Sequence, residues 1–239
     1  MLDPEIQVMP EGRFAELAAR RIADAIERAV EARGGCRLAL AGGSTPEPVY
    51  RALAAIEGVP FAAVDVFFGD ERAVPPDDSA SNYGMARRAL LDGLAVPPRA
   101  VHRIEGERGA PDAARAYAEV LGDTPLDVTL LGMGGDGHTA SIFPGAETPR
   151  EGPRVIATTS PSPPHSRVSL SLGAINESRS VYFLVAGARK AARLAQVRSQ
   201  IGRGEGALPA ARVVPASGRL VWLLDRAAAD GIEMTRGTR

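Results

Sequence analysis

The sequence is poor in the residues that crosslink a chain or anchor it to a membrane. Only one of its 239 residues is cysteine, Cys36, so no disulfide can form within the chain. A single thiol fits a reducing compartment, and we expect a cytoplasmic protein. The chain has no run of 18 apolar residues, and its N-terminus lacks the basic start and apolar core of a signal peptide. We therefore expect neither a membrane span nor a leader.

An excess of charge of either sign is also missing. Twenty-eight basic and 29 acidic residues give a net charge of −1, so no broad basic field is available for a nucleic acid. Cysteine and histidine do not occur at zinc spacing, and neither a calcium loop nor a Gly-x-Ser-x-Gly turn is found. We predict no metal and no serine nucleophile. Lysine is nearly absent, because 27 of the 28 basic residues are arginines and only Lys190 is a lysine.

The composition is otherwise that of a globular protein, with 45% apolar and 24% charged residues. Helical spacing of apolar residues alternates with short buried runs, which predicts an α/β fold with a mainly parallel sheet. Helices are expected over 14–30, 46–55, 82–91, 111–121 and 188–201. Strands are expected over 37–41, 64–68, 127–131, 155–158, 168–172, 181–185 and 220–224. Without a linker or repeat, residues 1–239 are predicted to form a single domain whose ligand binds at the carboxyl ends of the strands.

A first candidate site lies between a predicted strand and a predicted helix, at Gly42, Gly43, Ser44 and Thr45. Glycines let a ligand approach the backbone, and the N-terminus of the following helix favours phosphate. Thr45 is a plausible N-cap, with Pro46 in the first helical position. The Gly-Lys-Ser/Thr ending of a nucleotide-binding P-loop is missing. The alternative interpretation is a tight turn that only begins a helix.

A second candidate follows the next strand, where residues 70–81 are expected to form a polar loop. Asp70, Glu71 and Arg72 place two carboxylates and a guanidinium at the ligand edge of the sheet. Such a group can perform acid–base chemistry or bind a phosphate. The alternative is a solvated loop with a surface ion pair.

The third candidate is the glycine-rich turn over residues 131–141. Its glycines match the dinucleotide fingerprint formally, but it comes late in the chain, only a short helix can follow it, and residues 155–159 hold no acidic ribose partner. Asp136 stands two residues before His138, and a carboxylate can orient an imidazole that acts as a general base. The alternative is that His138 caps the short helix expected after it.

A fourth candidate is a pair of cations near the same predicted edge. Lys190 begins a predicted helix after a predicted strand. Lysine and arginine contact a phosphate differently, so the two residues are not equivalent at a binding site. Arg167 follows a proline-rich loop and has less support. The alternative for Lys190 is a solvated helical lysine. His102 and His165 lie in ordinary loop context and are assigned no role.

Taken together and in order, these segments resemble the 6-phosphogluconolactonase family. The resemblance rests on residues 40–46, 69–72 with 81–82, and 131–144, and it continues through 167–170, 187–190, 208–211 and 222–225. The related glucosamine-6-phosphate deaminases usually carry Asp-Glu-Tyr at residues 70–72 and a glutamate after the histidine turn. This chain has Arg72 and Phe143 instead, so the acid that assists ring opening is missing. These departures favour a lactonase over a deaminase or a non-catalytic sugar-phosphate sensor.

The resemblance implies a modified Rossmann-like, three-layer α/β/α fold without a cofactor. It implies hydrolysis of 6-phospho-D-glucono-1,5-lactone to 6-phospho-D-gluconate, a step of the oxidative pentose phosphate pathway, by a monomer or weak homodimer. His138 would activate water with Asp136 as a candidate orienting partner, and backbone N–H groups of residues 132–137 would stabilise the oxyanion. The remaining expected substrate-binding residues are Gly42, Gly43, Ser44, Thr45, Asp70, Arg72, Asn82, Gly134, Arg167 and Lys190, with the three cations gripping the phosphate.

Overall fold

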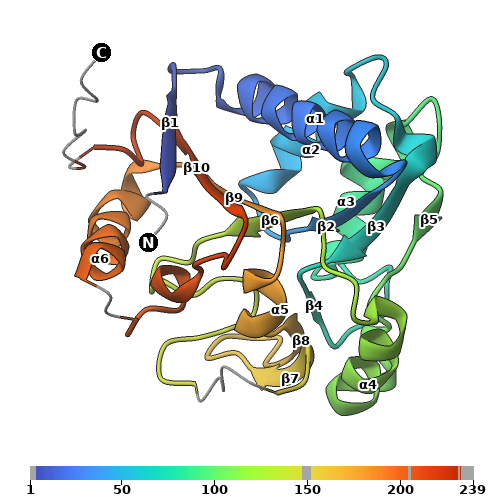
Figure 1. Ribbon diagram of the computed structural model, residues 1–239. Coiled ribbons are helices and arrows are strands. Elements are labelled where there is room, and N and C mark those ends of the chain that lie inside the picture. Colours follow the sequence, from blue (N-terminus) through green and yellow to red (C-terminus); the bar gives the residue numbers. More distant parts are fainter. Residues whose placement is uncertain (1–3, 147–151, 204–205, 231, 233–239) are drawn as a thin grey trace.

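The centre of the molecule is a parallel sheet of seven strands in the order β1-β10-β9-β6-β2-β3-β5 (Figure 1). The computed structural model describes residues 4–146, 152–203, 206–230 and 232, so both ends of the predicted domain lie outside the described residues. The strands of this sheet are β1 (Glu5–Met9), β2 (Cys36–Leu40), β3 (Val64–Phe68), β5 (Ala100–Val101), β6 (Val128–Gly132), β9 (Ser180–Val185) and β10 (Arg219–Asp225). The α/β class and the mainly parallel sheet are confirmed.

Helices cover both faces of this sheet and complete three layers (Figure 1). On one face lie α1 (Phe14–Arg33) and α2 (Pro46–Ala54), and α3 (Asn82–Ala89) contacts α2. On the other lie α5 (Leu172–Asn176) and α6 (Ala191–Arg203), and α4 (Ala110–Leu121) packs against a smaller sheet. Within the described ranges, no helix has the length and apolar character needed to cross a membrane.

The path of the chain through the sheet creates a crevice at its carboxyl edge. From β2 the chain moves outward through β3 to β5, and it then crosses back to β6 and continues through β9 to β10. The loops that leave β2 and β6 therefore depart in opposite directions from two neighbouring strands. Ligands of open α/β sheets bind where the strand order reverses in this way. This position joins two of the glycine-rich candidates, which are nearly 90 residues apart in the sequence.

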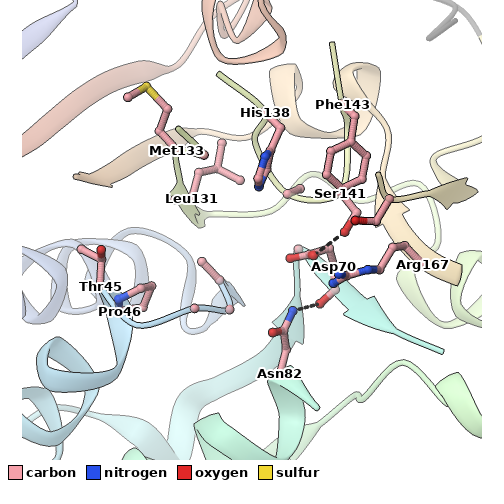
Figure 2. A pocket seen from close by; sticks show the side chains of 18 of the residues that line it. Thr45, Pro46, Asp70, Asn82, Leu131, Met133, His138, Ser141, Phe143 and Arg167 are labelled. Atoms are coloured by element: carbon pink, nitrogen blue, oxygen red, sulfur yellow. Dashed lines mark hydrogen bonds between the residues drawn. The ribbon is translucent and has the colours of Figure 1, made fainter. Parts of the chain in front are cut away.

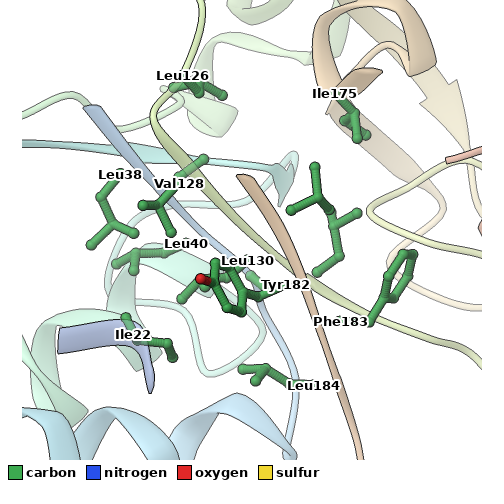
Figure 3. Packing of buried hydrophobic residues seen from close by; sticks show 14 of the residues in the cluster. Ile22, Leu38, Leu40, Leu126, Val128, Leu130, Ile175, Tyr182, Phe183 and Leu184 are labelled. Carbon is green, nitrogen blue, oxygen red and sulfur yellow. The ribbon is translucent and has the colours of Figure 1, made fainter. Parts of the chain in front are cut away.

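The apolar runs of the sequence become the packed faces of this sheet. Leu38, Leu40 and Leu130 are fully buried, and Ile22 packs on them from α1 while Ile175 approaches from α5 (Figure 3). Strands covered on both faces lose the alternation of polar and apolar residues and become continuous apolar runs. The same burial makes the sheet a rigid support for the loops at its carboxyl edge.

A second, antiparallel sheet of three strands differs from the expected organisation. The expected polar loop begins instead with strand β4 (Asp70–Arg72), which pairs with β8 (Ser166–Leu170), and β8 pairs with β7 (Val155–Thr159). Three consecutive charged residues carry no strand signal of their own, and only their distant partner strand makes them extended. Strands β1 and β5 and helix α5 were not predicted either, because each is short and lies at an edge or connection.

Candidate active site

A cavity of about 480 Å³ opens at the carboxyl edge of the central sheet, between the loops that follow β2, β3, β6 and β9 (Figure 2). The twelve residues that the sequence predicted as catalytic or substrate-binding all line it. They are Gly42, Gly43, Ser44, Thr45, Asp70, Arg72, Asn82, Gly134, Asp136, His138, Arg167 and Lys190. The structure thus brings the four separate candidates of the sequence into one site.

The loop after β2 is held close to its neighbours by a buried tyrosine and an asparagine. The Tyr50 hydroxyl accepts from the N–H of Ala41 and donates to its carbonyl, both at 2.8 Å. A Cβ at Gly42 would lie 1.9 Å from Asn82 Oδ1, so only glycine fits there. Thr45 precedes α2 but has helical backbone angles, and its side chain makes no capping bond. The predicted cap is therefore wrong, which leaves that hydroxyl to face the cavity.

Asp136 and His138 form a hydrogen-bonded pair in the turn after β6. Asp136 Oδ1 lies 2.6 Å from Nδ1 of His138 and also accepts from the backbone N–H of His138 at 3.1 Å. Burial raises the pKa of Asp136, but the hydrogen bonds and charge of His138 outweigh it, and the pKa falls below its ordinary value. An ionised Asp136 accepts a hydrogen bond from Nδ1–H of His138, so the proton of the neutral ring stays on Nδ1 and Nε2 is left as an acceptor.

The backbone after His138 turns sharply instead of starting a helix. Thr139 and Ile142 form an isolated antiparallel bridge, and Ala140 between them has a φ of 47°. The expected short helix is absent from this segment, so the capping interpretation of His138 is wrong. The ring of Phe143 instead packs against the imidazole, with their centroids 4.9 Å apart. The imidazole is therefore held by a carboxylate at one edge and by an aromatic ring.

Gly134 makes room for this pair. A Cβ at Gly134 would lie 2.1 Å from Nδ1 of His138 and 2.5 Å from Oδ1 of Asp136. The N–H of Gly134 donates to the His138 carbonyl at 2.9 Å, and the N–H of Gly137 donates to the Gly134 carbonyl at 3.1 Å. These two N–H groups already have acceptors inside the turn. They are therefore not available to an oxyanion, and the donors expected over residues 132–137 are limited to the other backbone N–H groups of this segment.

Two arginines lie side by side on adjacent strands of the small sheet. Arg72 of β4 stands directly opposite Arg167 of β8, so both side chains lie on the same face. Arg72 donates to the Ala80 carbonyl, and Nε of Arg167 donates to the Pro164 carbonyl at 2.7 Å. Burial, followed by the charge of Arg72, lowers the pKa of Arg167. Among the described residues neither guanidinium forms an ion pair. Two like charges held this close favour an anionic ligand.

The carboxylates of the same strand point in opposite directions. Asp70 lines the cavity, whereas Glu71 accepts from the backbone N–H groups of Asn82 and Tyr83 at 2.7 and 2.8 Å. These groups begin α3, so Glu71 is a buried N-terminal partner of that helix. Burial raises the pKa of Glu71 against these donors. Both carboxylates are buried, which makes the interpretation as a solvated surface loop wrong.

Lys190 approaches the cavity from the side of α6. It belongs to a single 3₁₀ turn, Ala188–Lys190, that follows β9. Burial lowers the pKa of Lys190, and the nearby charge of Asp136 opposes this shift. Lys190 is thus half-buried close to the turn that holds Asp136 and His138. His102, which stacks on Phe67, and His165 are outside the cavity lining.

The sequence interpretation missed several residues that line the cavity. They are mainly Ser141 and Phe143, in the turn after His138, and the loop over residues 160–162. Ser141 and Phe143 belong to the segment that carried the family resemblance, so their proximity to His138 was a usable signal. The loop over residues 160–162 is brought in by the pairing of β7 with β8, which no local pattern indicates.

Comparisons with known proteins identify the family of this chain. The family model described as "Glucosamine-6-phosphate isomerases/6-phosphogluconolactonase" matches residues 11–222. The rat 6-phosphogluconolactonase is 40% identical over 229 residues, which cover 90% of this chain and 87% of that protein. The human "GDH/6PGL endoplasmic bifunctional protein" is 37% identical over 93% of this chain, which spans only 29% of that protein's length. The crystal structure of 6-phosphogluconolactonase from Thermotoga maritima superposes with a TM-score of 0.83 at 30% identity, covering 94% of this chain and all of that one. The chain, with its aspartate–histidine turn at the switch point of the sheet, belongs to the glucosamine-6-phosphate isomerase/6-phosphogluconolactonase family.

Proposed function

We propose that this protein is a 6-phosphogluconolactonase, which hydrolyses 6-phospho-D-glucono-1,5-lactone to 6-phospho-D-gluconate in the oxidative pentose phosphate pathway. The observation that carries the proposal is the Asp136–His138 pair, which faces the same cavity as two unpaired arginines and a lysine. A general base beside cations that can bind a phosphate suits the hydrolysis of a phosphorylated ester. The names of the relatives at 37–40% identity support the same activity.

The proposed reaction needs one base and no cofactor, because a lactone is an activated ester. Nε2 of His138 takes a proton from water while the water oxygen attacks C1. The carbonyl electrons move onto the oxygen and form a tetrahedral oxyanion, whose collapse breaks the bond from C1 to the ring oxygen. The imidazolium then returns its proton to that leaving oxygen. Asp136 stabilises the imidazolium in between and keeps the ring in one orientation.

The phosphate of the substrate is proposed to bind the cations of the cavity. Arg72 and Arg167 offer guanidinium N–H groups, and Lys190 adds a point charge to the lining of the same cavity. The N-terminus of α2 contributes backbone N–H groups next to Ser44 and Thr45. Each of these groups interacts more favourably with a phosphate dianion than with a neutral hydroxyl group.

The direct test is proton release after freshly made phosphogluconolactone is added to the protein. Acid production well above the spontaneous hydrolysis of the lactone supports the proposal. A rate equal to the spontaneous one would contradict it. A coupled assay for ammonia from glucosamine-6-phosphate tests the deaminase alternative, which is disfavoured because Phe143 lines the cavity near His138. Product binding without turnover would instead indicate a sugar-phosphate sensor.

Arg72→Ala is expected to lower kcat/KM for the phosphorylated lactone about 10- to 100-fold, since a hydrogen bond to a charged group contributes about 1.5–3 kcal/mol. Turnover of unphosphorylated gluconolactone should fall much less. Steady-state kinetics on both substrates measure this difference. Arg115→Ala is the matched control, because Arg115 is an exposed arginine of α4 outside the cavity. Equal losses on the two substrates would mean that Arg72 does not contact the phosphate.

Lys190→Arg is expected to raise KM for the phosphorylated lactone and weaken product binding, with an unchanged melting temperature. The planar guanidinium is bulkier than an ammonium, so it does not fit a half-buried position where a compact ammonium contacts one phosphate oxygen. A calorimetric titration with 6-phosphogluconate compares wild type, Lys190→Arg and Lys190→Ala. Arg189→Lys, the reverse exchange at the exposed neighbouring position, serves as the control. If all four proteins bind the product equally, Lys190 has no role in phosphate binding.

The proposal also covers the organisation of the protein. We infer a single catalytic domain, because both sheets contribute to one hydrophobic cluster. We also propose that the protein acts as a monomer or weak homodimer. The free, buried thiol of Cys36 supports the cytoplasm as the compartment.

A further inference from the structure

An acidic and a basic side chain share the cavity wall without pairing. Asp70 and Arg167 are each only 8% exposed, and both lie on the same face of the small sheet. Yet no ion pair joins Asp70 to Arg167 or to Arg72 within the part of the chain that the structure describes. Opposite charges in a largely desolvated position attract one another more strongly than in water. A specific interaction must therefore keep the carboxylate of Asp70 away from the arginines.

That interaction comes from Ser141. Its hydroxyl donates a hydrogen bond of 2.6 Å to Oδ2 of Asp70, and the side chain is 1% exposed (Figure 2). Among the described residues, Oδ1 of Asp70 has no hydrogen-bond donor. An O–H···O⁻ contact of this length is a strong, charge-assisted bond. It fixes the direction of the carboxylate and competes with any nearby guanidinium.

The backbone of Ser141 is itself fixed by both neighbouring strands of the small sheet. Its N–H donates to Oγ of Ser169 in β8 at 3.2 Å, and its carbonyl accepts from Oγ1 of Thr158 in β7 at 2.8 Å. Ser169 stands opposite Asp70 in the strand pair. These two bonds hold the backbone of Ser141 at a fixed position beside Asp70. The donor stays in place and holds Asp70.

We propose that Ser141 is a positioning residue that withholds the carboxylate of Asp70 from Arg167 and so keeps the pair of Arg72 and Arg167 available to the substrate phosphate. This inference rests on the proposed function, which assigns the phosphate to these arginines. Without the hydroxyl, Asp70 rotates onto the nearest guanidinium and neutralises it. The substrate would then have to break an internal ion pair before its phosphate could bind.

The test is a double-mutant cycle on Ser141 and Asp70, read out by calorimetric titration with inorganic phosphate and by kinetics on the two lactones. Ser141→Ala is expected to weaken phosphate binding about tenfold and to raise KM for the phosphorylated lactone by a similar factor. Turnover of unphosphorylated gluconolactone should stay close to that of the wild type. In the Asp70→Asn background, Ser141→Ala should change nothing further, because a neutral amide cannot neutralise a guanidinium.

Ser178→Ala is the matched control. Ser178 is equally buried, and its hydroxyl bonds Thr129 at 2.8 Å outside the cavity. This variant should lose stability without any difference between the two substrates. If Ser141→Ala does not fold, Ser141→Cys replaces it, since a thiol keeps the volume but donates only weakly.

The possible outcomes separate this inference from the proposed function. Equal losses on both lactones, or the same loss in the Asp70→Asn background, would show that Ser141 is only structural and would overturn the inference. Phosphate affinities that are equal in wild type and Ser141→Ala, or undetectable in both, would also overturn it. If the wild type does not hydrolyse the phosphorylated lactone, the proposed function fails, and the phosphate titration still decides the role of Ser141.

Discussion

Replacing His138 by alanine is expected to lower kcat for phosphogluconolactone about 10²–10⁴-fold, the usual contribution of a general acid–base group. The side chain is part-buried, and among the described residues its hydrogen bond is to Asp136, so its removal should leave the fold intact. Proton release in a pH-stat, corrected for spontaneous hydrolysis, measures the loss. Circular dichroism and the melting temperature check folding.

His165→Ala is the matched control for this experiment. The Nδ1 of His165 lies 2.9 Å from the Ser160 carbonyl, and the residue is outside the cavity lining, so its loss should leave kcat nearly unchanged. A His138→Ala variant that retains wild-type kcat would remove His138 from the mechanism. The proposed attack of water would then require another base in the cavity.

The second large effect is expected from a single methyl group at Gly134. Gly134→Ala places a Cβ where Nδ1 of His138 and Oδ1 of Asp136 now lie, at 2.1 and 2.5 Å. Real Cβ contacts are never this short, so the pair must separate or the turn must move. We expect kcat to fall about as far as in His138→Ala, roughly 10²–10⁴-fold, because an unoriented imidazole is a poor base.

The neighbouring glycine provides the control for this substitution. A Cβ at Gly135 would meet no atom within 4 Å, so Gly135→Ala should retain most of the activity in the same assay. A nuclear magnetic resonance spectrum of the His138 ring protons in both variants reports whether the imidazole has left its position. An active Gly134→Ala enzyme with an unshifted His138 signal would show that the turn adapts without losing the base.

The outcome for His138 and Thr45 shows where local patterns are sufficient and where they fail. The Asp136–His138 pair was predicted because the two residues are only two positions apart in a turn and a carboxylate can orient an imidazole, and the structure brings them into contact. The Thr45 cap failed because capping depends on the backbone angles of one residue. The loop after β2 is held by Tyr50 of the following helix and by Asn82 at the distant start of α3. A side chain's local neighbours are predictable, whereas its backbone angles in an irregular loop are not.

Strand β4 shows a stronger version of the same limit. Residues 70–72 have no apolar alternation and were expected to be a loop, because three charged residues in a row are typical of exposed segments. Pairing with β8 makes them extended and places Arg72 opposite Arg167. The two residues are 95 positions apart, and no periodicity links them. The contact of Ser141 with Asp70 arises in the same way.

The α/β class and the order of the main strands and helices could be predicted from apolar periodicity, which is a property of short segments. Twelve of the residues that line the cavity could be predicted from the loops expected at the carboxyl edge of a parallel sheet together with the family resemblance. Three relations of the site could not be read from any local pattern: Arg72 stands opposite Arg167, Glu71 turns to α3, and Ser141 bonds Asp70. Those relations depend on pairing between distant strands, whose free energy comes from packing across the whole fold and is not encoded in any single segment.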